Sequence, residues 1–277
     1  MKINPLRLNT SNKDFEKEIL KRIRINNSIN KKVQNEVDSI ISNIKKNGDK
    51  SLVGFIRKFD NYNIKNIKNI VITPNEIKKA YECIDKLQLT NLKKSIKRIR
   101  DFSKKQKAVS WTSKKDGSIL GEKVTPIETV GIYVPAGKAS YPSTVLMNAI
   151  PAKIAGVKNI IMACPISNIE DHALAIVAAD LCGVHVILRM GGAHAIAALA
   201  YGTKSISKVD KIVGPGNIYV TLAKKAVFGD VGIDNIAGPS EVVIIADSSN
   251  NPDWIAMDLF SQAEHDELAQ PILISSS

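Results

Sequence analysis

The sequence lacks a long apolar run. Its first residues lead directly into a charged stretch, without the apolar segment of roughly 7 to 15 residues that a secretory signal needs. No window approaches the ~18 uninterrupted apolar residues that span a bilayer. We therefore expect a cytoplasmic protein with no membrane partner. With 277 residues, of which 44% are hydrophobic and 24% charged, the chain is typical of a globular protein with room for two domains.

Cysteine is also scarce. The three cysteines, Cys83, Cys164 and Cys182, are an odd number and lie far apart in apolar surroundings. This pattern favours reduced thiols in the core over a disulfide framework or a zinc knuckle.

Acidic residues are few in the first half of the chain. Residues 1–125 hold 30 Lys and Arg against 13 Asp and Glu, whereas residues 126–277 hold 9 against 14, so the net charge of +12 belongs to one region. One interpretation is an RNA-binding module; the other is the solvated face of amphipathic helices. Lysine outnumbers arginine 32 to 7, although arginine is the residue expected for phosphate or base recognition. We favour solvated helices and no nucleic-acid partner.

Apolar spacing predicts two kinds of organisation along the chain. Residues 12–58 and 75–108 show mainly helical spacing, with a short strand expected at 69–73. From residue 128 onward, apolar strands alternate with alanine-rich helices, which predicts parallel sheets covered on both faces. The expected strands are 130–134, 157–163, 184–188, 211–213, 242–246 and 271–274, and the expected helices are 143–155, 171–181, 193–201, 217–228 and 252–264. The predicted fold class is therefore α/β, with Rossmann-like parallel sheets flanked by helices and a helical N-terminal region.

The last residues begin a strand that nothing after them covers. A complete domain seldom ends in this way, so we expect a shortened chain with a bare sheet edge and poor solubility.

Glycine-rich loops follow three of the predicted strands, at 135–138, 191–194 and 214–217. Ligands bind at the carboxyl ends of parallel strands, where glycine lets the backbone approach closely and helix N-termini attract anions. Each loop alone is also explained as a tight turn, and none has the GxGxxG pattern. Three in succession predict a dinucleotide or phosphate site.

A second group of polar residues ends the helix expected at 252–264. Gln262 and His265 are three residues apart, so on a helix their side chains point the same way and could share one metal ion. Other ligands would have to come from elsewhere. The alternative is a histidine interacting with the helix dipole. Of the other histidines, we expect His185 in the core, and none pairs with a nucleophile.

Together these blocks resemble the histidinol dehydrogenase family. The matching segments are 130–135, 141–157, 191–193, 195–203, 211–217, 233–234, 237–241, Asp258 and 261–265, with Gly48-Asp49 and Phe59-Asp60 near the start. The similarity spans nearly the whole chain.

The resemblance implies a zinc-dependent enzyme that oxidises L-histidinol to L-histidine in two steps with NAD, the last step of histidine biosynthesis. It implies a homodimer and three sets of site residues: Tyr133, His194 and Asn217 for NAD; Ser240, Gln262 and His265 for the substrate; and Gln262 and His265 for zinc. It also implies a division into an N-terminal helical arm (1–25), a first α/β domain (26–128 with 238–277) and a Rossmann-like NAD-binding domain (129–237).

The sequence departs from the family pattern in two respects. His194 stands where the family usually has glutamine, and Ala136 where it has glycine, so we expect a weakened NAD contact. The chain also corresponds to roughly the first two thirds of a family member. The catalytic Glu-His pair would lie beyond residue 277, so no catalytic residue is assigned and we expect this chain alone to be inactive. The alternative is a degenerate, non-catalytic remnant or an interaction protein of the same fold.

Overall fold

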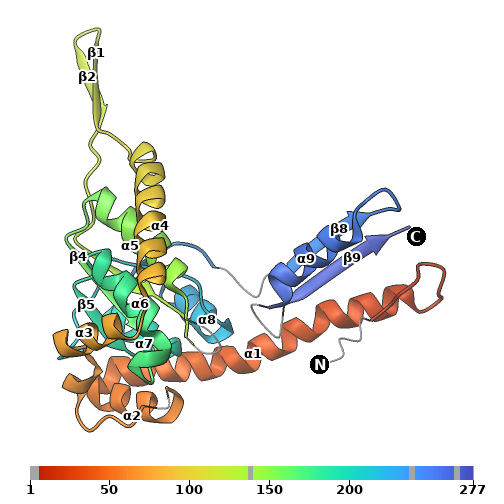
Figure 1. The fold of residues 1–277 in the computed structure, drawn as a ribbon, viewed down its shortest axis with the longest axis horizontal. Coiled ribbons are helices and arrows are strands. Elements are labelled where there is room, and N and C mark those ends of the chain that lie inside the picture. Colours follow the sequence, from red (N-terminus) through yellow and green to blue (C-terminus); the bar gives the residue numbers. More distant parts are fainter. Residues whose placement is uncertain (1–5, 61, 137–139, 237–240, 265–268, 277) are drawn as a thin grey trace.

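The centre of the molecule is a five-stranded parallel sheet (Figure 1). The computed structural model describes residues 6–60, 62–136, 140–236, 241–264 and 269–276. The sheet has the order β5-β4-β3-β6-β7 and consists of β3 (Thr129–Tyr133), β4 (Asn159–Cys164), β5 (Val186–Arg189), β6 (Lys211–Val213) and β7 (Gly232–Ile233). The chain builds outward from β3 to β5 and then crosses back to β6. The strand order therefore reverses between β3 and β6, the place where such sheets bind ligands.

Helices cover both faces of this sheet, which explains why its strands are apolar throughout. One apolar cluster lies under α5 (Pro142–Ala155) and α6 (Ile169–Leu181), with α3 (Pro74–Glu82) and α4 (Lys86–Lys105) packed outside them. A second cluster lies under α7 (Gly192–Tyr201) and α8 (Ile218–Val227), against which α1 (Phe15–Asn47) and α2 (Asp49–Phe59) pack. The predicted α/β class with its helical N-terminal region is confirmed.

The long helix α1 owes its position to a stripe of apolar side chains. Val33, Val37, Ile40 and Ile44 recur every three or four residues and are buried against α7 and α8. The helix is continuous across residue 25, where the arm was expected to end, and the division into domains stays a prediction. No helix in the described part of the chain is both long and apolar enough to cross a membrane.

The strand expected at residues 69–73 is wrong. Residues Ile67–Ile70 form the 3₁₀ helix η1, because the Asn66 side chain accepts the backbone N–H of Lys68 and caps the turn. Pairing with β5 is limited to an isolated bridge from Val71, followed by a 2.9 Å bond from the Ile72 N–H to a β5 carbonyl.

A hairpin that we did not predict joins α4 to the sheet. Its strands are β1 (Trp111–Lys115) and β2 (Ser118–Glu122), connected by Asp116 and Gly117, which both have positive φ. This is the turn that an Asp-Gly pair favours. Every residue of both strands is exposed, so the buried and exposed alternation that marks a strand is missing, and the hairpin projects from the body in Figure 1.

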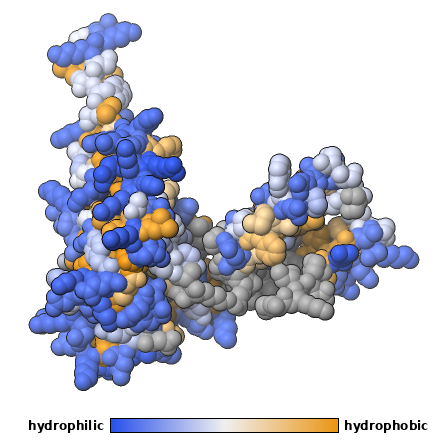
Figure 2. Space-filling model, viewed as in Figure 1, coloured by the Kyte–Doolittle hydropathy of each residue, from blue (hydrophilic) through white to orange (hydrophobic). Residues whose placement is uncertain are grey.

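The last three elements form a small unit of their own. Strands β8 (Glu241–Ala246) and β9 (Gln270–Ser275) pair in parallel and pack against α9 (Pro252–Ala263). In Figure 1 this unit lies apart from the five-stranded sheet. Figure 2 shows hydrophobic surface on this unit. The large apolar side chains exposed on it include Val243, Ile245, Trp254, Met257, Phe260 and Ile274.

Candidate functional site

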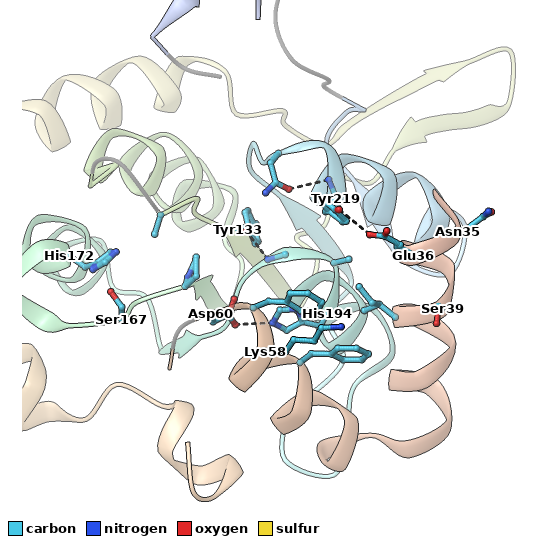
Figure 3. A pocket seen from close by; sticks show the side chains of 18 residues that line it. Asn35, Glu36, Ser39, Lys58, Asp60, Tyr133, Ser167, His172, His194 and Tyr219 are labelled. Carbon is cyan, nitrogen blue, oxygen red and sulfur yellow. Dashed lines mark hydrogen bonds and ion pairs between the residues drawn. The ribbon is translucent and has the colours of Figure 1, made fainter. Parts of the chain in front are cut away.

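A cavity of about 970 Å³ lies beside the carboxyl ends of β3 and β6, where the strand order reverses. Its volume is at the upper end of the ~300–1,000 Å³ range of small-molecule sites. Helices α1, α2, α7 and α8 contribute to its lining (Figure 3). Its lining includes Glu36, Phe55, Phe59, Asp60, Tyr133, His194, Asn217 and Tyr219.

Asn217 reaches the cavity from the start of α8. It is the N-cap residue of that helix, and its Oδ1 accepts the backbone N–H groups of Tyr219 and Val220 at 3.1 and 3.2 Å. Capping therefore fixes the orientation of the amide, because its oxygen satisfies helix donors that have no partner within the helix. The amide NH₂ is the part of the side chain that these bonds leave for a ligand.

Tyr133 ends β3 and forms the floor between the two strands. Its side chain is buried, and its hydroxyl oxygen accepts the backbone N–H of Gly192 at 3.0 Å. Burial raises the pKa of this phenol far above its usual range, so the hydroxyl is protonated at neutral pH. Tyr133 thus offers a neutral hydroxyl and an aromatic ring, and it ties β3 to the first turn of α7.

Asp60 joins α2 to the first turn of α7. Its Oδ2 accepts the backbone N–H of Gly191 at 3.1 Å and lies 2.9 Å from Nε2 of His194. The side chains of Asp60 and His194 are 6% and 2% exposed, so this contact is almost closed to solvent. A carboxylate at a helix N-terminus is favoured by the helix dipole.

Two phenylalanines of α2 form an apolar wall beside this pair. The rings of Phe55 and Phe59 stack near the His194 ring, with centroids 6.0 and 6.1 Å away. Phe59 is half-exposed along the cavity, and the ammonium of Lys58 lies 4.9 Å from its ring centroid. The wall leaves room for a flat apolar group and carries a positive charge at its edge.

The rim of the cavity carries a polar contact between α1 and α8. The hydroxyl of Tyr219 donates to a carboxylate oxygen of Glu36 at 3.0 Å (Figure 3). This bond, together with burial, raises the pKa of Tyr219. The contact closes one side of the cavity and places a negative charge there.

The structure brings together all three residues expected to bind NAD. Tyr133, His194 and Asn217 line the same cavity, although they come from the end of β3, the first turn of α7 and the N-cap of α8. His194 differs from expectation in one respect: Asp60 engages its Nε2, so only the rest of a nearly buried ring faces the cavity.

The expected zinc and substrate residues are not placed in the same way. Ser240 and His265 lie outside the described residues. Gln262 is half-buried near the end of α9 and is not among the described residues that line the cavity. Within the described part of the chain, no three His, Cys, Asp or Glu side chains are grouped so that they could hold a metal ion. The described residues do not form a zinc site by themselves.

Sequence reasoning missed several cavity residues. Phe59-Asp60 was one of the matching segments, but it was given no role because its partner His194 is 134 positions away. In the sequence, Glu36 is indistinguishable from the other charged residues on the solvated face of an amphipathic helix. The core position expected for His185 is wrong: the residue precedes β5, is exposed, and accepts the Ile160 N–H at 3.0 Å.

Comparison with known proteins identifies the family. The family model described as histidinol dehydrogenase matches residues 23–277. The chain belongs to the histidinol dehydrogenase family. The histidinol dehydrogenase of Pseudomonas savastanoi pv. phaseolicola is 47% identical over 270 residues, which cover 97% of this chain and 60% of that protein. The enzyme of Methylococcus capsulatus is 48% identical, with 97% and 62% covered.

A solved structure of the family has the same fold. The crystal structure of histidinol dehydrogenase from Elizabethkingia anophelis matches with a TM-score of 0.78 at 37% identity, covering 88% of this chain and 57% of that one. The present chain thus spans about 60% of the length of the histidinol dehydrogenases that it matches.

Proposed function

We propose that this chain carries the NAD-binding part of a histidinol dehydrogenase, which oxidises L-histidinol to L-histidine in two NAD-linked steps at the end of histidine biosynthesis. The observation that carries the proposal is the convergence of Tyr133, His194 and Asn217 on one cavity at the point where the strand order reverses. Family membership makes histidinol the substrate to test first.

The residues of the cavity suit a dinucleotide. Asn217 presents an amide held by the helix cap, and the wall formed by Phe55 and Phe59 offers an apolar face to a flat ring. Tyr133 contributes its ring at the floor. Asp60 holds the α7 turn and His194 in place. In this proposal His194 supports the cofactor with its ring, and its Nε2 remains with Asp60.

When bound, one NAD would accept the hydride that leaves the alcohol carbon, and a second NAD would accept the hydride that leaves the hydrated aldehyde. A base must remove the hydroxyl proton in the first step. The family resemblance assigns this role to a Glu-His pair beyond residue 277. The described cavity residues therefore bind and orient the cofactor, and none of them is proposed as the base. We expect no turnover from this chain alone.

Zinc belongs to the proposal through the resemblance alone. Gln262 and His265 are the residues of this chain proposed to hold it, with the substrate also contacting Ser240. The described residues do not form a metal site by themselves, so further ligands would have to complete it. A homodimer and a cytoplasmic location are likewise proposed from the family.

Binding of NADH to this chain tests the proposal directly, through the change in NADH fluorescence on titration. We expect Asn217→Ala to weaken binding, because it removes an amide that faces the cavity. Asn251→Ala is the matched control: Asn251 caps α9 in the same way, through the N–H of Asp253 at 2.8 Å, but lies away from the cavity. Each variant loses about 1 kcal/mol of capping. Equal NADH affinity in the two variants would contradict the assignment.

A further inference from the structure

An ion pair between a buried lysine, Lys224, and a partly exposed aspartate, Asp234, holds the loop between β6 and α8. Nζ of Lys224 donates to the backbone carbonyl of Gly214 at 2.9 Å, and Oδ2 of Asp234 accepts the N–H of the same residue at 2.8 Å. Lys224 and Asp234 also contact each other directly as an ion pair. Both polar groups of one glycine are therefore held by side chains from two other parts of the chain.

The lysine of this pair is shielded from solvent, whereas the aspartate is partly exposed. The Lys224 side chain is 4% exposed and the Asp234 side chain 32%. Burial alone would raise the pKa of Asp234, but the Lys224 ammonium and the N–H groups of Gly214 and Asn235 hold it below its usual value. The carboxylate is thus ionised at neutral pH and neutralises a lysine that has been taken out of water.

Gly214 in turn is pressed against the floor of the cavity. Its φ is +114°, and a Cβ at this position would lie 2.1 Å from the backbone carbonyl oxygen of Tyr133. Only glycine permits this approach. The position of Gly214 is therefore fixed on one side by β3 and on the other by Lys224 and Asp234.

The same loop ends at Asn217, three residues later. Lys224 lies seven residues beyond Asn217 on α8, which is two helical turns and the same face. The ion pair thus connects the last turn of α8 to Gly214 in the loop before that helix, and Gly214 lies against Tyr133 at the end of β3. An ion pair, whether buried or exposed, is weak evidence for stability. The position of the Lys224–Asp234 pair favours a role in orienting the β6–α8 loop.

We infer that Lys224 and Asp234 are positioning residues of the dinucleotide cavity: by holding both backbone groups of Gly214, they fix the β6–α8 loop so that Asn217 and Tyr133 face the cofactor at a constant separation. The identity of the ligand in this inference rests on the proposed function. The ordering of the loop by Lys224 and Asp234 does not, because it is measurable without any ligand.

Two variants test the inference. Asp234→Asn keeps an oxygen for the Gly214 N–H but removes the charge that faces Lys224, and Lys224→Met removes the donor to the Gly214 carbonyl. We expect each variant to weaken NADH binding about tenfold, which is about the free energy contributed by one hydrogen bond. Binding is measured at a temperature where circular dichroism shows each variant fully folded.

Glu76→Gln is the matched control. Glu76 pairs with Arg189, whose side chain is 5% exposed against 33% for the carboxylate, so the burial closely matches that of the Lys224 pair. This pair joins β5 to α3 and does not line the cavity. We expect Glu76→Gln to lower the melting temperature to a similar extent while changing NADH affinity less than about twofold.

Hydrogen exchange supplies the readout that needs no ligand. In the Asp234 and Lys224 variants, amides at the start of α8 should exchange faster than in the parent chain, whereas in the control they should not. Unchanged exchange there, or an equal loss of NADH affinity in the control, would overturn the inference. If the parent chain binds no NADH, the proposed function fails, and the exchange data still decide whether the pair orders the loop.

Discussion

Replacing Asp60 by alanine removes the contact that fastens α2 to the first turn of α7. Two donors then lose their acceptor inside the protein: the Gly191 N–H at 3.1 Å and Nε2 of His194 at 2.9 Å. The side chains of the Asp60–His194 pair are at most 6% exposed, so water does not readily replace the carboxylate. The substitution should therefore lower both the stability of the protein and the order of the cavity wall.

The size of the effect follows from the two bonds. An unsatisfied buried donor costs about 1–3 kcal/mol, so two cost about 4 kcal/mol in total. For a chain of this size, a loss of about 4 kcal/mol lowers the melting temperature by roughly 8–16 °C. Asp60→Asn, which keeps one acceptor oxygen, should lose less than Asp60→Ala.

Urea unfolding followed by circular dichroism measures this loss as a shift of the midpoint at constant slope. Asp230→Ala is the control: Asp230 also accepts a hydrogen bond, from the Tyr201 hydroxyl at 2.8 Å, but its side chain is 56% exposed. We expect a much smaller shift for that variant. If Asp60→Ala and Asp230→Ala were equally stable, the argument from burial would be refuted.

Three further predictions concern other parts of the structure. Gly214→Ala should lower the unfolding free energy, measured by the same urea unfolding. The positive φ at this position costs ~1–3 kcal/mol, and the contact of the new Cβ with a β3 carbonyl adds to that cost. The pKa of Asp234 is lowered in the folded protein, so its contribution to stability is present above pH ~4 and is lost as the pH falls through the folded-state pKa. The difference in unfolding free energy between the parent chain and Asp234→Asn should therefore narrow below pH ~4. A difference that stays constant with pH would contradict this. Burial raises the pKa of Cys164 to about 12 and that of Cys182 to about 11, so a thiol reagent should modify exposed Cys83 first and the other two only after unfolding.

The regular part of the fold was predictable because it is buried. Strands such as β4, with Ile160 to Cys164 all buried, read as continuous apolar runs, and the alanine-rich helices between them show where the chain crosses the sheet. The exposed hairpin at 111–122 has no such pattern, and only its Asp-Gly turn marked it in the sequence. Asn66 gave the 3₁₀ turn that displaced the strand expected at 69–73, a local side-chain bond that outweighed β propensity.

The cavity was predictable only in part, for a related reason. Its glycine-rich loops follow strands, so the position of the floor could be predicted from the order of elements, whereas the roles of Tyr133 and Asn217 came from the family resemblance. Its wall comes from helices that precede the sheet, and no local pattern shows which face of an amphipathic helix meets a given loop. Asp60 and Glu36 became recognisable as cavity residues only when the packing of α1 and α2 was known.

The distance along the chain between wall and floor also bears on how the protein is made. Asp60 is 134 residues from His194, and Glu36 is 183 residues from Tyr219. On the ribosome, α1 and α2 emerge long before the α/β layers against which they finally rest, and contacts between such distant segments form slowly. We therefore expect the nascent helices to wait without a partner until translation has passed α8, and the cavity to close as one of the last events of folding.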